Sequence, residues 1–141
     1  MARNDGLQRV YNELPHDFIR RMRNWAASEA GVRPRLISAV YRGMPRTVYN
    51  GGHVPILFGE ASDVELAMHA LQPAYRVAVV LFWSFEGMPL RQLAEKCGVA
   101  DYRTFASRLS RGHGELRAEL ARRRAQFAQL EAANRATARR L

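Results

Sequence analysis

The sequence of 141 residues is poor in cysteine and has no long apolar run. Its single cysteine, Cys97, excludes an internal disulfide bond. No apolar stretch approaches the roughly 20 residues that a membrane-spanning helix needs, and the first residues lack the pattern of a secretory signal. Metal-ligand spacing is also absent from the scattered histidines, which are His16, His53, His69 and His113. We therefore expect a cytoplasmic protein without a metal, a cofactor or a membrane partner.

Lysine is almost absent, although the chain is strongly basic. Lys96 is the only lysine, every other basic residue is arginine, and the net charge is +9. Arginine makes bidentate contacts with phosphate and guanine that lysine cannot make. Genome base composition explains the ratio of arginine to lysine equally well, but it does not explain the excess of positive charge. The charge predicts a nucleic-acid partner.

The N-terminal part is predicted to contain one amphipathic helix between two irregular segments. Residues 1–14 are expected to form a flexible arm. Apolar residues at helical spacing predict a helix from Pro15 to about Ala30. Three prolines and five glycines in residues 31–61 predict a loop, in which Asn50-Gly51-Gly52 is a candidate hairpin turn.

Two core helices are predicted next. Ser62 and Glu65 have the spacing of a capping box, which predicts a helix that begins at Ser62. Pro73 predicts the start of a second, nearly all-apolar helix that Gly87 stops. A helix with apolar residues on every side is buried on several sides. A chain of this length therefore suits one domain with a single core.

Residues 89–111 have the pattern of a helix-turn-helix. Ala94 is the small residue that lets the second helix pack closely, and Gly98 is the glycine expected in the turn. Phe105 and Leu109 are apolar anchors of the second helix. A helix pair that serves only core packing is the structural alternative.

The second helix of this motif is predicted to begin after the N-cap Asp101 and to halt at Gly112 and Gly114. Its outward face is rich in groups that contact phosphates and base edges in DNA. Together with two residues of the first helix, the candidate DNA-binding residues are Arg91, Lys96, Tyr102, Arg103, Thr104, Ser107, Arg108 and Arg111.

Residues 115–141 are predicted to form a basic C-terminal helix or tail after the helical domain of residues 15–114. The 122–124 arginine triplet is either a solvated face or a phosphate contact. A partial apolar seam consists of Leu116, Leu120, Phe127 and Leu130, and in heptad register Arg123, Asn134 and Thr137 would interrupt it, which argues against a stable coiled coil. The predicted fold class is all-α, a compact helical domain with a helix-turn-helix and a long C-terminal helix or tail.

Groupings of catalytic residues are also missing. Asp63 and Glu65 belong to a predicted helix start, and no histidine or nucleophile stands beside them in sequence. Cys97 falls where the first helix of the motif packs, so it is expected to be a small buried hydrophobe. We expect no enzymatic activity.

The stretch from Phe85 to Leu120 resembles the region-four helix-turn-helix of bacterial sigma factors. The closest points are Thr104-Phe105-Ala106-Ser107-Arg108-Leu109 and Glu115-Leu116-Arg117. Between Val99 and Thr104 there is one residue more than the usual turn carries. The resemblance implies RNA polymerase as a second partner of the same module.

Residues 20–120 as a whole resemble the phage late-gene antitermination protein Q family, in the group without a zinc motif. The resemblance rests on Arg23-Asn24-Trp25-Ala26, residues 55–61 and residues 67–76. It implies a factor that binds a DNA element overlapping a late promoter, engages paused RNA polymerase and occupies the RNA exit channel, so that terminators are read through. The implied partners are double-stranded DNA, bacterial RNA polymerase with or without its sigma factor, nascent RNA and further copies of the chain on the elongation complex.

Two other functions fit the same pattern. A stand-alone DNA-binding activator or repressor needs the helix-turn-helix and no contact with elongating polymerase. A small terminase subunit of a DNA-packaging machine joins a helix-turn-helix to an oligomerising helix, for which the seam in residues 116–130 is the candidate.

Overall fold

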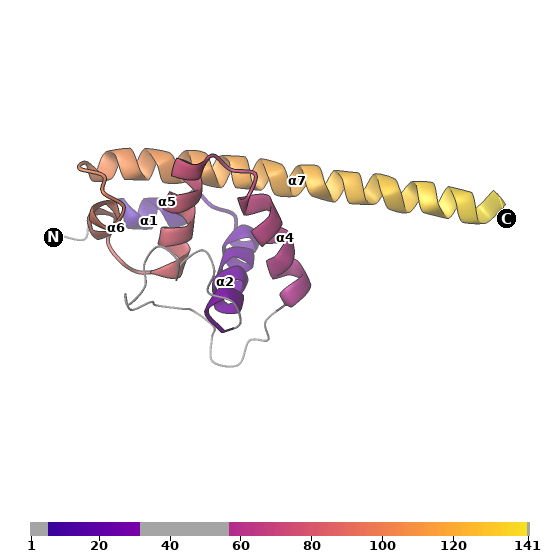
Figure 1. Cartoon of the computed structure of the whole chain (residues 1–141), viewed down its shortest axis with the longest axis horizontal. Helices are drawn as coiled ribbons and strands as arrows, with labels where there is room; N and C mark the ends of the chain where they lie inside the picture. Colours follow the sequence, from indigo (N-terminus) through magenta and orange to yellow (C-terminus); the bar gives the residue numbers. More distant parts are fainter. Residues whose placement is uncertain (1–5, 32–56, 141) are drawn as a thin grey trace.

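The computed structural model describes residues 6–31 and 57–140, and within these ranges the chain forms six helices and no strand. They are α1 (Leu7–Asn12), α2 (His16–Gly31), α4 (Phe58–Met68), α5 (Pro73–Ser84), α6 (Leu90–Lys96) and α7 (Tyr102–Arg140). Helix α7 runs the length of the molecule, with the other helices gathered along its N-terminal part (Figure 1). The predicted all-α class with a long C-terminal helix is confirmed. The candidate hairpin turn at residues 50–52 lies outside the described residues.

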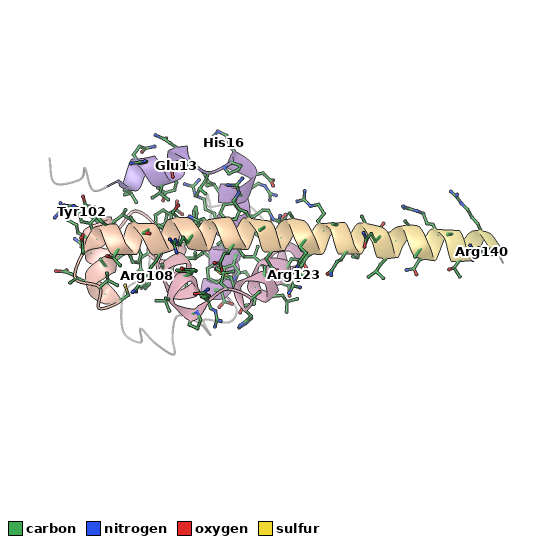
Figure 2. All side chains as sticks on the ribbon, turned by 90° about the horizontal axis from the view of Figure 1, so that it is seen from above. Glu13, His16, Tyr102, Arg108, Arg123 and Arg140 are labelled. Atoms are coloured by element: carbon green, nitrogen blue, oxygen red, sulfur yellow. The ribbon has the colours of Figure 1, made fainter. Side chains whose placement is uncertain are left out.

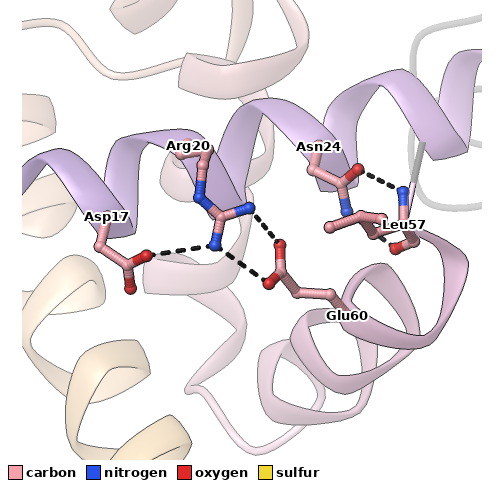
Figure 3. Close-up of polar contacts among 5 residues, drawn as sticks. All are labelled: Asp17, Arg20, Asn24, Leu57 and Glu60. Atoms are coloured by element: carbon pink, nitrogen blue, oxygen red, sulfur yellow. Dashed lines mark hydrogen bonds and ion pairs between the residues drawn. The ribbon is translucent and has the colours of Figure 1, made fainter. Parts of the chain in front are cut away.

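Helices α2 and α4 pack side by side and are tied together at the start of α4. The Leu57 N–H donates to Asn24 Oδ1 over 2.8 Å, and Asn24 Nδ2 donates to the Leu57 carbonyl over 2.9 Å (Figure 3). One turn away, the two terminal nitrogens of the Arg20 guanidinium donate to the Glu60 carboxylate, at 3.0 and 3.1 Å. These contacts fix the first turn of α4 before Ser62 is reached.

The predicted start of α4 at Ser62 is therefore wrong, because the helix begins at Phe58. Ser62 lies inside it, so no capping box forms. Glu65 instead accepts a hydrogen bond from Trp25 Nε1 at 3.0 Å and lies 3.2 Å from His69 Nε2. A contact from another helix has overridden the local capping signal.

Helix α5 is the centre of the core. It begins at Pro73 as predicted, and all seven residues from Ala78 to Ser84 are buried. The helix ends at Ser84, three residues before the predicted stop, and Gly87 lies in the following turn with φ +95°. Trp83 Nε1 donates to His113 Nε2 of α7 over 2.9 Å, which links the two helices inside the core.

Helix α7 continues through Gly112 and Gly114, where it was predicted to halt. A Cβ atom on Gly112 would lie 2.6 Å from Val79 Cγ2 and 3.0 Å from the Tyr75 carbonyl oxygen, so glycine is needed for the close crossing of α5 and α7. Glycine inside a helix costs only about 1 kcal/mol, which tertiary packing readily offsets. The predicted domain boundary after residue 114 thus falls inside one continuous helix.

The predicted flexible arm contains helix α1 in its described part, residues 6–14. The Tyr11 ring packs on Phe82 and Trp83 with centroid distances of 5.5 and 6.0 Å. Tyr11 also donates through its hydroxyl to Glu86 over 2.9 Å, and the same carboxylate accepts from Arg23. An aromatic anchor and a hydrogen bond hold this short helix against α5.

The C-terminal part of α7 projects beyond the other helices (Figure 1). Leu116 and Leu120 are the last of its buried side chains, and Phe127 and Leu130, further along the same face, are 64% and 62% exposed. Within residues 6–31 and 57–140, no helix combines the length and apolar character that crossing a membrane requires.

Candidate nucleic-acid interface

The turn between α6 and α7 has a defined geometry. Gly98 adopts φ +75°, the left-handed conformation predicted for it. The Val99 N–H donates to the Ala94 carbonyl over 2.9 Å, and the Gly98 N–H donates to the Glu95 carbonyl over 3.1 Å. This pair of bonds is a Schellman motif, which closes the end of α6.

The start of α7 is capped as predicted. Asp101 Oδ1 accepts from the Arg103 N–H over 2.9 Å, and the Asp101 carbonyl accepts from the Thr104 N–H over 3.0 Å. Phe105 and Leu109 are fully buried and anchor the first turns of α7 on the core. The position and direction of the second helix are thus set at its cap and on its inner face.

The predicted DNA-binding residues divide into an open group and a partly covered group. Tyr102 and Arg108 are only partly exposed. The exposed residues are Arg91 and Lys96 on α6 and Arg103, Thr104, Ser107 and Arg111 on α7. We call the last four the recognition face. Viewed onto this side of the molecule, the N-terminal part of α7 lies in front of the other helices (Figure 2).

Neighbouring groups hold three of these side chains in place. The Arg91 guanidinium lies 4.4 Å from the centre of the Tyr102 ring, a cation–π contact between the two helices of the motif. Arg111 donates to the Tyr75 hydroxyl over 3.2 Å. Such ordering reduces the entropy lost when a side chain binds a phosphate or a base.

Cys97 lies at the end of α6 and is partly buried, with its thiol donating to the Ala94 carbonyl at 3.4 Å. Burial raises the pKa of this thiol, and the charge of Arg108 only partly opposes that effect. The thiol form therefore predominates at neutral pH. The side chain is less buried than predicted.

A groove of about 960 Å³ runs between α1 and α7, beside the recognition face. Two recognition-face residues, Arg103 and Ser107, line it. The groove also has polar groups that were not predicted from the sequence as binding residues, which are Gln8, Arg9, Glu13, Ser110, His113 and Arg117. Arg103, Ser110 and Arg117 are spaced seven residues apart, which places them on one side of a continuous helix. This pattern was missed because the helix was predicted to stop at Gly112.

Most of the charge of the protein resides on α7. The helix contains ten arginines and three glutamates, so it carries seven of the nine net positive charges of the chain. The recognition face is the N-terminal end of this basic helix. An anionic partner is therefore attracted to the same helix that presents the hydrogen-bond donors.

His113 lies beneath the groove and is buried. Burial, with a smaller effect of the Arg117 charge, lowers its pKa to about 3. The ring is therefore neutral at physiological pH, and its Nε2 accepts from Trp83.

No group of three or more His, Cys, Asp or Glu side chains that would hold a metal ion occurs in the described part of the chain.

Comparisons of the chain with protein-family models, with curated proteins and with solved structures find no significant match.

Proposed function

We propose that the protein is a DNA-binding transcription regulator that reads duplex DNA through α6 and α7. The observation that supports this most directly is the exposed recognition face on a helix whose start is fixed by a Schellman turn and an aspartate cap. Helix-turn-helix proteins place the N-terminal residues of their second helix against base edges in the major groove. Arg103 and Thr104, in the first turn of α7, have that position.

The experiment for DNA reading is selection of binding sites from random duplexes, followed by footprinting of the selected site. Arg103→Ala weakens binding to the selected site about 10-fold or more if Arg103 contacts a base, and it relaxes the preference at one position. Asp63→Asn, on the exposed surface of α4, is a control that leaves the footprint unchanged. Absence of any preferred duplex would contradict the proposal.

Within this class we propose antitermination of the phage late-gene type as the activity. The support is the resemblance of the α2, α4 and α5 segments to the Q family, together with the sigma-like character of the helix-turn-helix. Two of the resembling segments contact each other in the fold, since Asn24 binds Leu57. The DNA-reading module is then the loading step of a factor that travels with polymerase.

Transcription by purified bacterial polymerase tests antitermination. The template carries a late promoter, its promoter-proximal pause and an intrinsic terminator, with the selected DNA site placed at the promoter. Added protein increases the fraction of transcripts that pass the terminator, and Arg103→Ala abolishes the increase. Unchanged readthrough with wild-type protein, on a template that it footprints, would leave a stand-alone activator or repressor as the function.

A further inference from the structure

The arginines of α7 are not distributed evenly around the helix. Successive residues of an α-helix are rotated by about 100° about the helix axis. Residues that are seven or eleven positions apart therefore lie within about 20° of each other around the helix. Arg117 and Arg124 are seven residues apart, Arg135 follows after eleven, and Arg139 lies one turn further. We call these four residues the basic track. It spans about 33 Å along α7 at about 1.5 Å per residue.

Two hollows adjoin the beginning of this track. The α1/α7 groove is followed along α7 by a smaller hollow of about 180 Å³ between α2 and α7, and Arg117 lines both. Arg124 lines the second hollow together with Arg21 of α2. The Nε of Arg21 is buried and has no hydrogen-bond partner among the described residues.

Two acids also line the hollows, and each lies beside an arginine, although Arg20 is shared between Asp17 and Glu60. Glu13 is paired with Arg9 at 3.1 Å and Asp17 with Arg20 at 3.1 Å. Beyond Leu120, α7 carries six arginines and a single glutamate. In Figure 2, long side chains tipped with nitrogen project from this projecting part on the side where α1 lies. The track is therefore a positively charged surface along one side of the molecule.

Duplex DNA held on the recognition face does not reach this surface. The track begins about 22 Å from the N-terminal end of α7, and its far end lies about 55 Å from that end. The major groove winds around B-DNA once in about 34 Å, so a straight helix that enters the groove at its N-terminus diverges from it within a few turns. The basic track is left for another anionic partner.

We propose that the basic track and the adjoining hollow between α2 and α7 bind a single strand of nucleic acid. A single strand is flexible and carries a phosphate on every nucleotide, so it can follow a straight row of arginines that a duplex cannot follow. Arginine supplies bidentate phosphate contacts there. A second copy of the chain is a poor occupant, because the projecting part of each α7 carries a net charge of +5 and the copies would repel. The inference does not depend on the proposed antitermination activity.

Binding of the full-length protein to a fluorescent 15-nucleotide single strand of mixed sequence, followed by anisotropy, tests the proposal. The track variant is Arg117→Gln with Arg124→Gln. The control is Arg122→Gln with Arg140→Gln, which removes the same charge from the same helix on a side about 140° away. All four side chains are exposed, so both variants are expected to keep the helicity and melting temperature of the wild type.

The track variant is expected to bind the strand about 10-fold or more weakly than the wild type at 150 mM salt, and the control less than about 3-fold more weakly. The slope of log affinity against log salt falls by about 1.4 in the track variant, as for the loss of two single-strand phosphate contacts. Equal losses in the two variants, or no strand binding by the wild type at 10 μM, would overturn the proposal.

Two further arms of the experiment identify the strand and separate this site from the duplex site. Oligoribonucleotide and oligodeoxyribonucleotide of the same sequence show whether the 2′-hydroxyl contributes. The track variant is expected to keep its duplex footprint, and Thr104→Ala with Arg111→Ala is expected to lose the footprint while retaining strand binding. If single-strand binding is lost with the recognition face and not with the track, the proposal fails while the duplex-reading function stands.

Discussion

The two glycines inside α7 permit a matched test of the packing between α5 and α7. A Cβ at Gly114 would meet no atom within 4 Å, whereas a Cβ at Gly112 would lie 2.6 Å from Val79 Cγ2 and 3.0 Å from the Tyr75 carbonyl oxygen. Both positions are interior to the same helix, so replacement by alanine brings the same propensity gain of about 1 kcal/mol. The difference between the two variants therefore isolates the steric cost of the crossing.

The magnitude follows from the contact distances. Carbon atoms pack at about 3.5–4.0 Å, so Gly112→Ala forces α5 and α7 apart by roughly 1 Å or displaces the Val79 side chain. Overpacking of this kind costs about 1–3 kcal/mol. We expect Gly114→Ala to raise the free energy of unfolding by about 1 kcal/mol and Gly112→Ala to lower it by about 0–2 kcal/mol.

Urea denaturation, followed by circular dichroism and by the fluorescence of Trp25 and Trp83, measures both values. The double variant Gly112→Ala with Val79→Ala removes the methyl group that the new Cβ would strike. Its loss of unfolding free energy is therefore expected to be smaller than the sum of the losses in the two single variants. Equal stabilisation by Gly112→Ala and Gly114→Ala would refute the close crossing as the reason for glycine at 112.

Other expected outcomes concern folding and binding. Because the pKa of His113 falls from an unfolded value near 6.5 to about 3 in the fold, the native state binds fewer protons, and stability falls as pH drops below about 6.5, by about 3 kcal/mol at pH 4. His113→Gln should flatten this dependence in urea titrations at pH 7 and pH 4, and an unchanged slope would show that other groups dominate. Asp101→Ala removes the cap of α7 and should lower the free energy of unfolding by about 1 kcal/mol, with Asp63→Ala as an exposed control that has little effect. Asn24→Ala breaks both bonds to Leu57 and should destabilise the fold by about 1–2 kcal/mol, and accelerated amide exchange at the start of α4 is the specific readout.

Several elements were predictable because their signals act within a few residues. Pro73 begins α5, Gly98 takes the left-handed conformation and Asp101 caps α7, each through its own backbone or a neighbouring amide. Apolar spacing likewise identified Phe105 and Leu109 as buried anchors. The recognition face follows from the same periodicity, since the side opposite a buried stripe is exposed.

Other features depend on contacts between residues far apart in the chain, which local signals do not reveal. Asn24 binds Leu57, the residue before α4, from 33 residues away, and Tyr11 holds α1 in place through Phe82 and Glu86. Gly112 has the same intrinsic helix penalty as any glycine, and only the approach of Val79 makes it necessary within a continuous helix.

Local signals along the chain were enough to predict the all-α class, the helix pair at residues 89–111 and the basic character of the protein. Contacts between distant residues made the second helix of the motif and the C-terminal basic segment one continuous helix. The helix continues past the predicted boundary because packing of α5 against α7 offsets the cost of a glycine inside a helix, which is about 1 kcal/mol. The arginines of α7 therefore belong to one helix, which carries both the recognition face and the basic track.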